Sequence, residues 1–89
     1  MPTWELYANG RVQGVGFRYF VWKTASELGI KGYVNNQWDG SVKIVAQADE
    51  HLLQAFKQII AQGNRYAKVR ELQIYNLESA EKYNDFEIR

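Results

Sequence analysis

Gly14, Gly16 and Arg18 stand close together in the stretch GRVQGVGFRYF, residues 10–20. Gly14 and Gly16 can adopt backbone conformations that turn successive N–H groups into one concavity, which favours an oxyanion. Arg18 follows where a helix is expected to begin, and a cation there is unfavourable by about 0.3–1 kcal/mol because the unpaired N–H groups are already partly positive. A bound phosphate would remove that penalty, since guanidinium matches phosphate oxygens in a two-pronged manner. The stretch therefore indicates an anion site, with a structural turn and a surface arginine as the plain alternative.

Two other phosphate-binding motifs share these glycines, and the stretch lacks an essential part of each. A P-loop needs lysine and then Ser or Thr after its second glycine, but Phe17 and Arg18 occupy those places. A dinucleotide-binding fingerprint needs a third glycine where Tyr19 stands, and the sequence predicts no parallel strand–helix–strand unit around it. Neither motif explains the stretch.

The spacing of apolar residues predicts the elements that must position this turn, since alternation indicates strands and 3.6-residue spacing indicates helices. The second helix is expected to be capped by Asp49 and to end at Gly63. Strands are expected over residues 4–12, 30–36, 41–48, 68–75 and 85–89, and helices from about Arg18 to Leu28 and from Asp49 to Gly63. This order is the split βαβ pattern. It predicts an α+β, ferredoxin-like fold with two helices on one face of an antiparallel sheet and a short added C-terminal strand.

One irregularity is predicted within the fourth strand. Val69 is out of phase with Leu72 and Ile74, which indicates a β-bulge near Arg70 and Glu71.

Composition narrows the classes of function. The 89 residues predict a single domain over residues 1–89, and the net charge of +1 argues against a protein that wraps nucleic acid. There is no cysteine, which excludes disulfides, thiolate metal sites and a thiol nucleophile. No signal peptide or apolar run of 18 residues is present, so we expect a cytoplasmic protein with no membrane partner.

At this point two stretches carry a family resemblance. GRVQGVGFRYF closely resembles the signature loop of acylphosphatases, and GYVNNQWDGSV (residues 32–42) resembles their second signature, G-[Trp/Tyr]-V-x-N-x-x-D-G. The resemblance extends over essentially the whole chain and implies hydrolysis of carboxyl-phosphate mixed anhydrides. It implies that Asn36 holds the attacking water. We further expect that neither a metal nor a cofactor is needed and that the protein is a monomer. The phosphate-binding residues that the resemblance implies are Gln13, Gly14, Val15, Gly16, Phe17 and Arg18.

The residue types suit that chemistry independently of the family. An acyl phosphate already has a weakly basic leaving group, so the main tasks are to neutralise phosphoryl charge and to place water in line. The one histidine, His51, is remote from both signatures and is expected to face solvent. Asp39 is expected to be a turn residue. Taken alone, Asn36 is a turn former by default, but its amide can also accept from water and donate to phosphate.

Several alternatives stay open. An anion-binding module of the same fold, without turnover, would share Arg18. An RNA-binding domain is disfavoured because SVKIVAQA, residues 41–48, has no aromatic residue for stacking. The opening domain of a hydrogenase-maturation protein is disfavoured because no zinc-binding cysteines follow. Tyr33 and Trp38 flank Asn36 in the sequence. Their side chains either line the substrate site or pack against the rest of the protein.

The sequence departs from the family pattern at two places. Asn64 follows Gly63 where proline is common, and Ala48 stands where glycine is frequent. Both departures are expected to affect local loop shape and stability rather than the chemistry.

Overall fold

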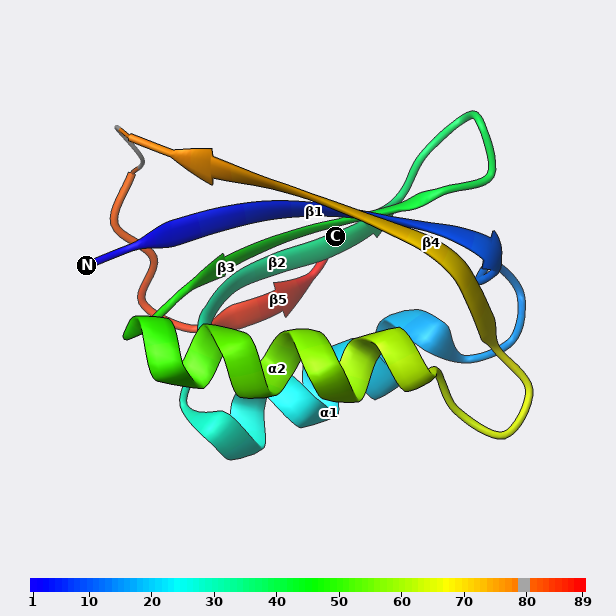
Figure 1. Cartoon of the computed structure of the whole chain (residues 1–89), viewed down its shortest axis with the longest axis horizontal. Helices are drawn as coiled ribbons and strands as arrows, with labels where there is room; N and C mark the ends of the chain where they lie inside the picture. The colour runs from blue at the N-terminus through cyan, green and yellow to red at the C-terminus, as the bar shows by residue number, and fades with distance from the viewer. Residues whose placement is uncertain (79–80) are drawn as a thin grey trace.

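The chain folds into one sheet with two helices packed on a single face (Figure 1). The computed structural model describes residues 1–78 and 81–89. Its elements are β1 (Thr3–Arg11), α1 (Phe17–Leu28), β2 (Lys31–Asn36), β3 (Val42–Gln47), α2 (Glu50–Gln62), β4 (Lys68–Leu77) and β5 (Phe86–Ile88). This order confirms the expected ferredoxin-like α+β fold, and every boundary lies within about two residues of its predicted place.

The sheet has the strand order β4-β1-β3-β2-β5. All neighbours are antiparallel except β2 and β5, which run parallel with Tyr33 opposite Glu87. The sheet is therefore mixed rather than wholly antiparallel as expected. The reason is topological: β4 ends at the same end of the sheet at which β5 begins, so β5 runs opposite to β4 and in the direction of β2 (Figure 1).

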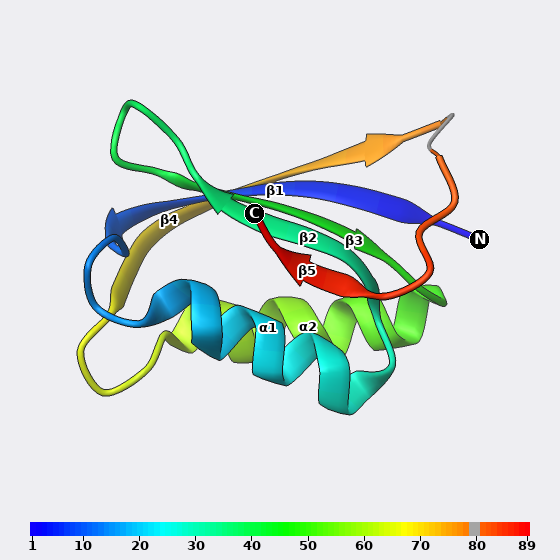
Figure 2. The ribbon, with the colours of Figure 1, turned by 180° about the vertical axis from the view of Figure 1, so that it is seen from behind.

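The core lies between the sheet and the helices because alternate strand residues point toward the helical layer. Figures 1 and 2 show α1 beneath β2 and β5, while α2 packs toward β4. Burial of each large apolar side chain contributes about 1.5–3 kcal/mol. The large fully buried side chains include Leu6, Val34 and Ile44 from the sheet, Phe17 and Val21 from α1, and Leu53, Phe56 and Ile60 from α2. Phe17 thus anchors the first residue of α1 in this core.

A β-bulge at the end of β1 directs the chain out of the sheet. Asn9 pairs with Glu71 and Gly10 pairs with Val69, which leaves Arg70 as the extra residue of β4. This confirms the predicted bulge. Gly10 has φ 132°, and a Cβ there would collide with the carbonyl oxygen of Lys68, so the close approach requires glycine. The bulge increases the local bend just before residues 12–16 leave the sheet.

The loop after α2 is organised by Asn64, one of the two departures from the family pattern. Its side-chain oxygen accepts hydrogen bonds from the amides of Tyr66 (3.0 Å) and Ala67 (2.7 Å). A side-chain oxygen that bonds the amide two residues ahead forms an Asx turn, which stabilises a loop without proline. Ala48, the other departure, is buried, and its amide donates to the carbonyl of Pro2 at 3.2 Å.

The described residues include no helix that is both long enough and apolar enough to span a membrane.

Candidate active site

The glycine loop connects β1 to α1 in a left-handed backbone conformation at two positions. Gly14 and Gly16 have φ values of 75° and 76°, and nothing lies within 4 Å of a Cβ built at either one. The backbone conformation itself, rather than lack of space, therefore makes glycine favourable here. Gly16 is also the N-cap of α1, and no side chain caps the helix.

The main-chain amides of this loop and of the first helical turn are available to a ligand. The first helical hydrogen bond runs from the amide of Phe20 to the carbonyl of Gly16, at 3.1 Å, so the amides of residues 17–19 have no partner within the helix. In residues 1–78 and 81–89, no hydrogen bond is donated by the amides of residues 14–16 to another main-chain group. The first turn of α1 contains no acidic residue. This helix start is therefore electropositive and unoccupied by the protein itself.

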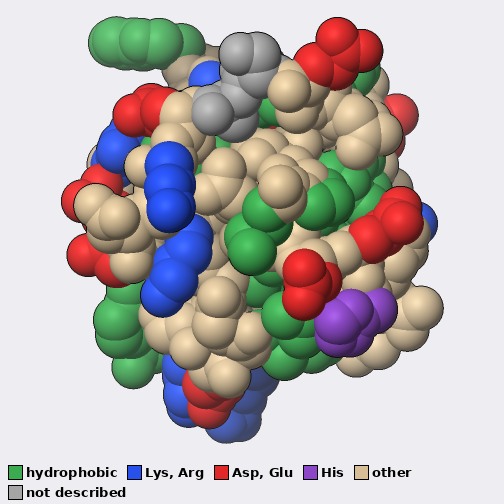
Figure 3. Space-filling model, turned by 90° about the vertical axis from the view of Figure 1, so that its left-hand side faces the viewer, with side chains coloured by type: hydrophobic (Ala, Val, Ile, Leu, Met, Phe, Trp, Pro, Cys, Tyr) green, Lys and Arg blue, Asp and Glu red, His purple; other side chains and the backbone are tan. Residues whose placement is uncertain are grey.

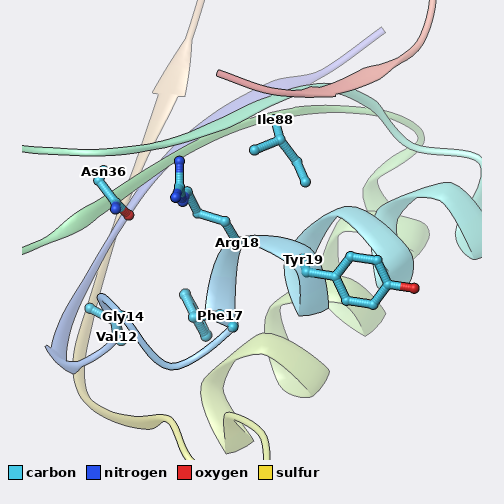
Figure 4. Close-up of a pocket in the computed structure, with 8 residues that line it drawn as sticks. Val12, Gly14, Phe17, Arg18, Tyr19, Asn36 and Ile88 are labelled. Carbon is cyan, nitrogen blue, oxygen red and sulfur yellow. The ribbon is translucent and has the colours of Figure 1, made fainter.

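Arg18, the second residue of α1, adds a full positive charge to these donors. Its side chain is exposed and extends from α1 toward β2 (Figure 4). Within the described part of the chain, the ion pairs join Lys43 to Glu5 and Arg89 to Glu87. Arg18 therefore has no carboxylate partner among these residues. The cation expected from the sequence stands at the start of the helix without a counter-charge.

Asn36, the last residue of β2, faces Arg18 across the pocket. Its backbone pairs with Val42 in β3, which fixes its place at the end of the hairpin. Among buried side-chain nitrogen and oxygen atoms of the described residues, the Oδ1 atom of Asn36 is the one that has no hydrogen-bond partner. A buried acceptor in this state costs about 1–3 kcal/mol. Figure 4 shows the amide directed toward the glycine loop, on the side where the Arg18 guanidinium lies.

These groups meet in one pocket of about 210 Å³. From the expected set it contains Gly14, Gly16, Phe17, Arg18 and Asn36, whereas Gln13 and Val15 are absent from its lining. Val15 is instead half-buried against the core. The pocket also includes residues that sequence reasoning did not select: Val12, Tyr19 and Ile88. Tyr19 follows Arg18 directly, which is a signal that could have been used, but the approach of Ile88 depends on strand pairing.

The side chain of Gln13 joins the glycine loop to the β2–β3 hairpin. Its amide nitrogen donates to the main-chain oxygens of Gln37 and Ser41, each at 2.8 Å. The sequence left open whether Gln13 braces the loop or lies free on the surface, and the structure shows the brace. The two segments that carry Arg18 and Asn36 are therefore mechanically connected.

The turn of the same hairpin is held by Asp39. Its carboxylate accepts hydrogen bonds from the Ser41 hydroxyl (2.6 Å) and the Ser41 amide (2.9 Å). The hydroxyl bond, followed by the amide bond, lowers the pKa of Asp39 below its ordinary value of 3.8 because both favour the ionised form. The expected role of Asp39 as a turn residue is confirmed.

Neither aromatic residue beside Asn36 lines the pocket. Trp38 is fully exposed at the turn, so it neither walls the pocket nor packs. Tyr33 lies outside the pocket lining. Its ring packs edge-on to Tyr83, with 6.0 Å between the ring centroids, and the Arg89 guanidinium lies 4.1 Å from the Tyr33 centroid. Of the two expectations for Tyr33, packing is therefore correct.

His51 is exposed near the start of α2, as expected. Figure 3 shows it on the surface at one end of the molecule, whereas the loop of residues 12–16 lies at the opposite end in Figure 1. Among the residues that the structure describes, no group of three or more His, Cys, Asp or Glu side chains is placed to hold a metal ion. The polar groups that the structure brings together at the pocket are main-chain amides, the guanidinium of Arg18 and the carboxamide of Asn36.

Comparison with known proteins identifies relatives along nearly the full chain. The acylphosphatase family model matches residues 4–88. The chain is 44% identical to an acylphosphatase of Pasteurella multocida, covering 96% of this chain and 94% of that protein. It is 46% identical to an acylphosphatase of Archaeoglobus fulgidus, covering 99% and 98%. The crystal structure of acylphosphatase from Bacillus subtilis is similar with a TM-score of 0.96 and 37% identity, covering 100% of this chain and 99% of that one.

Proposed function

Because the chain belongs to the acylphosphatase family, we propose that it hydrolyses acyl phosphates to a carboxylate and inorganic phosphate. One observation carries the proposal beyond family membership. Among the described residues, the guanidinium of Arg18 has no carboxylate partner and the buried Oδ1 atom of Asn36 has no hydrogen-bond partner, and both residues line the same pocket. Such a pair suits a reaction in which a phosphoryl group and a water molecule must meet.

In this proposal the phosphoryl group binds at the start of α1. The amides of residues 14–18 donate to its oxygens, and Arg18 adds two parallel charge-assisted hydrogen bonds. These donors are fixed before the substrate arrives, since Gly14 and Gly16 already hold the left-handed conformation that turns the loop inward. Fixed donors stabilise the charge of the transition state without further reorganisation.

Asn36 would position the attacking water. Its Oδ1 atom accepts one hydrogen of the water, and its Nδ2 group donates to a phosphoryl oxygen. This water would give the buried oxygen the hydrogen-bond partner that it lacks among the described residues. As a neutral amide, Asn36 does not repel the substrate dianion as a carboxylate would.

The proposed step balances without an added acid or base. The water oxygen attacks phosphorus, the bond between phosphorus and the acyl oxygen breaks, and its electron pair leaves with the carboxylate. The proton of the water passes to a phosphoryl oxygen, which gives dihydrogen phosphate. The carboxylate is a stable anion, so it leaves without protonation. Every group in this scheme comes from one chain, and we propose that a monomer is sufficient.

The proposal is tested by comparing an acyl phosphate with an ordinary phosphate monoester. Purified protein should release phosphate from benzoyl phosphate but not from p-nitrophenyl phosphate, and the activity should persist in EDTA. Loss of activity in EDTA would reveal a required metal ion. Binding of inorganic phosphate without hydrolysis of any acyl phosphate would contradict the proposal and favour a non-catalytic anion-binding module.

A further inference from the structure

Charged side chains are unevenly distributed between the two ends of the molecule. Figures 1 and 2 show the glycine loop, the β2–β3 hairpin and the segment that joins α2 to β4 at one end, and the end of α1, the starts of β2 and α2 and the segment that joins β4 to β5 at the other. The cations at the first end are Arg11, Arg18, Arg65, Lys68 and Arg70, and the carboxylates there are Asp39 and Glu71. The carboxylates at the second end are Glu27, Asp49, Glu50, Glu78, Glu81 and Asp85, and the cations there are Lys31 and Lys82. The net charge of +1 therefore conceals a basic end, which carries the pocket, and an acidic end.

Arg65, Lys68 and Arg70, here called the basic segment, belong to this basic end but have no role in the phosphate chemistry proposed above. All three residues are exposed. Neither of the two ion pairs within the described part of the chain includes any of them. Lys68 lies directly opposite another cation, Arg11, in the pairing of β1 with β4. Like charges in this arrangement repel each other, so the basic segment favours the approach of an anion.

The basic segment begins β4 close to the pocket. Lys68 pairs with Arg11, and the next residue in the chain, Val12, lines the pocket. Paired residues of antiparallel strands are about 5 Å apart and consecutive Cα atoms about 3.8 Å apart, so the backbone of Lys68 lies within about 9 Å of this lining. Arg70 is the extra residue of the bulge at the same end of β4. Charges at this separation act on a ligand in the pocket through their field, because the Debye length is about 10 Å at 0.1 M salt and about 30 Å at 0.01 M.

We propose that the basic segment attracts anionic substrates to the pocket through its electric field and thereby raises kcat/KM without taking part in the chemical step. This inference rests on the proposed function. Charge of one sign gathered beside a cleft raises the local concentration and the association rate of an oppositely charged substrate by about 10- to 1000-fold. The carboxylates of the acidic end repel the same dianion, so its approach to the pocket end is favoured. Because the field acts on free substrate, kcat should not depend on it.

A second role for these cations makes a different prediction. Strand β4 lies at one edge of the sheet, and charged side chains on an edge strand discourage pairing with other chains. Protection of the edge would affect solubility but not the kinetics of hydrolysis. The two roles are therefore separated by measuring kcat/KM against ionic strength.

Two double variants with the same change in net charge provide the test. Lys68→Gln/Arg70→Gln removes two charges from the basic segment, and Lys31→Gln/Lys82→Gln removes two from exposed positions at the start of β2 and just before β5. At an ionic strength of about 0.01 M, kcat/KM for benzoyl phosphate should fall about 5-fold in the first variant and change little in the second. The kcat values of both should equal that of wild type. At about 0.5 M sodium chloride the first variant should match wild type, because salt screens the field.

A measurement on the unmodified protein keeps the inference testable if the variants fold poorly. The acyl group of 4-carboxybenzoyl phosphate carries one negative charge more than that of benzoyl phosphate. Its kcat/KM should therefore fall about 1.5-fold more steeply with ionic strength, in proportion to the total charge of each substrate. Comparison of the two slopes removes the difference in intrinsic reactivity between the compounds.

The outcomes distinguish this inference from the proposed function. Equal slopes for the two substrates, an equal loss of kcat/KM in both double variants, or a loss that persists at high salt would overturn the attraction by the basic segment, while hydrolysis of benzoyl phosphate still supported the proposed function. Unchanged kinetics with lower solubility of Lys68→Gln/Arg70→Gln would overturn it in favour of edge protection. Hydrolysis of neither substrate by wild type would overturn both.

Discussion

The side-chain amide nitrogen of Gln13 lies 2.8 Å from the main-chain oxygen of Ser41, so the glycine loop is joined directly to the hairpin that ends β2. The same nitrogen donates to the oxygen of Gln37, which follows Asn36 in the chain. The Gln13 side chain therefore links the proposed phosphate-binding loop to the segment that carries the proposed water-binding residue. Gln13 is a positioning residue in this interpretation, since its amide is already used by the protein.

Replacing Gln13 with Met should separate positioning from binding. Met has a similar length but cannot donate, so the hairpin loses its link to the loop. We expect kcat for benzoyl phosphate to fall about 10-fold while the inhibition constant of inorganic phosphate changes little, because a small misplacement of the water affects turnover more than binding. Gln58→Met, an exposed change on α2, is the control. A parallel change in kcat and phosphate binding would argue that Gln13 acts only on general stability.

Asn36→Ala should abolish turnover without weakening the fold. The variant removes a buried oxygen that has no hydrogen-bond partner among the described residues, so no hydrogen bond of the protein to that atom is lost. We expect the free energy of unfolding in urea to be no lower than that of wild type, and inorganic phosphate to bind still. Unchanged benzoyl phosphate hydrolysis would remove Asn36 from the mechanism.

Arg18→Lys tests whether the guanidinium shape matters or only its charge. A lysine ammonium cannot make two parallel bonds to a phosphoryl group, so kcat/KM should fall about 10- to 100-fold. Arg11→Lys is the matched control, because Arg11 ends β1 near the loop but lies outside the pocket lining. Normal activity of the Arg18 variant would show that two-pronged recognition is not used.

Gly16→Ala tests the left-handed conformation of the loop. A non-glycine residue at φ 76° costs about 1–2 kcal/mol, although no atom obstructs the added methyl group. Gly29 offers a close control at the C-terminal end of α1, with φ 75° and the same open surroundings. Thermal unfolding should show similar destabilisation for Gly16→Ala and Gly29→Ala. Calorimetry should show weakened phosphate binding for Gly16→Ala alone. Equal phosphate binding by the two variants would contradict the proposed phosphate-binding site at the glycine loop.

Asp39→Ala should destabilise the protein in a pH-dependent manner. The pKa of Asp39 is lowered on folding by the hydroxyl and amide of Ser41, so its contribution is present above the ordinary value of 3.8 and is lost as pH falls through the lowered pKa. The difference in melting temperature between wild type and variant should therefore be largest near neutral pH and shrink below about pH 3.8. Glu27→Ala, an exposed change on α1, serves as the control. A difference that persists unchanged in acid would exclude this explanation.

Much of the fold follows from the sequence because local pattern and tertiary burial agree. The alternation of Trp4, Leu6 and Ala8 places them in the core, and the phase slip at Val69 reports a real bulge at Arg70. The direction of β5 was not accessible in this way. Three residues carry no signal of parallel or antiparallel pairing, since that choice depends on where the preceding chain crosses the sheet.

The candidate site was predicted as a set of residues rather than as an arrangement. Glycines and arginine in one turn indicate an anion site through their own backbone and charge preferences. The Oδ1 atom of Asn36 lacks a hydrogen-bond partner among the described residues because of how neighbouring groups pack. No local sequence pattern indicates this. The same holds for Ile88, which reaches the pocket only through pairing with β2. For Trp38 the sequence expectation was wrong. A large aromatic residue near Asn36 suggested contact with the substrate or with the core, but its side chain is fully exposed.

The place of β1 between β4 and β3 has a consequence for how this protein acquires activity during folding. Thr3 pairs with both Gln47 and Leu77, so the strand that leads into the glycine loop is fixed only after distant segments have come together. Such non-local pairing slows folding and favours an all-or-none transition in small domains. Refolded molecules should therefore regain phosphate release on the same time course as native tryptophan fluorescence, with no active species preceding the native state.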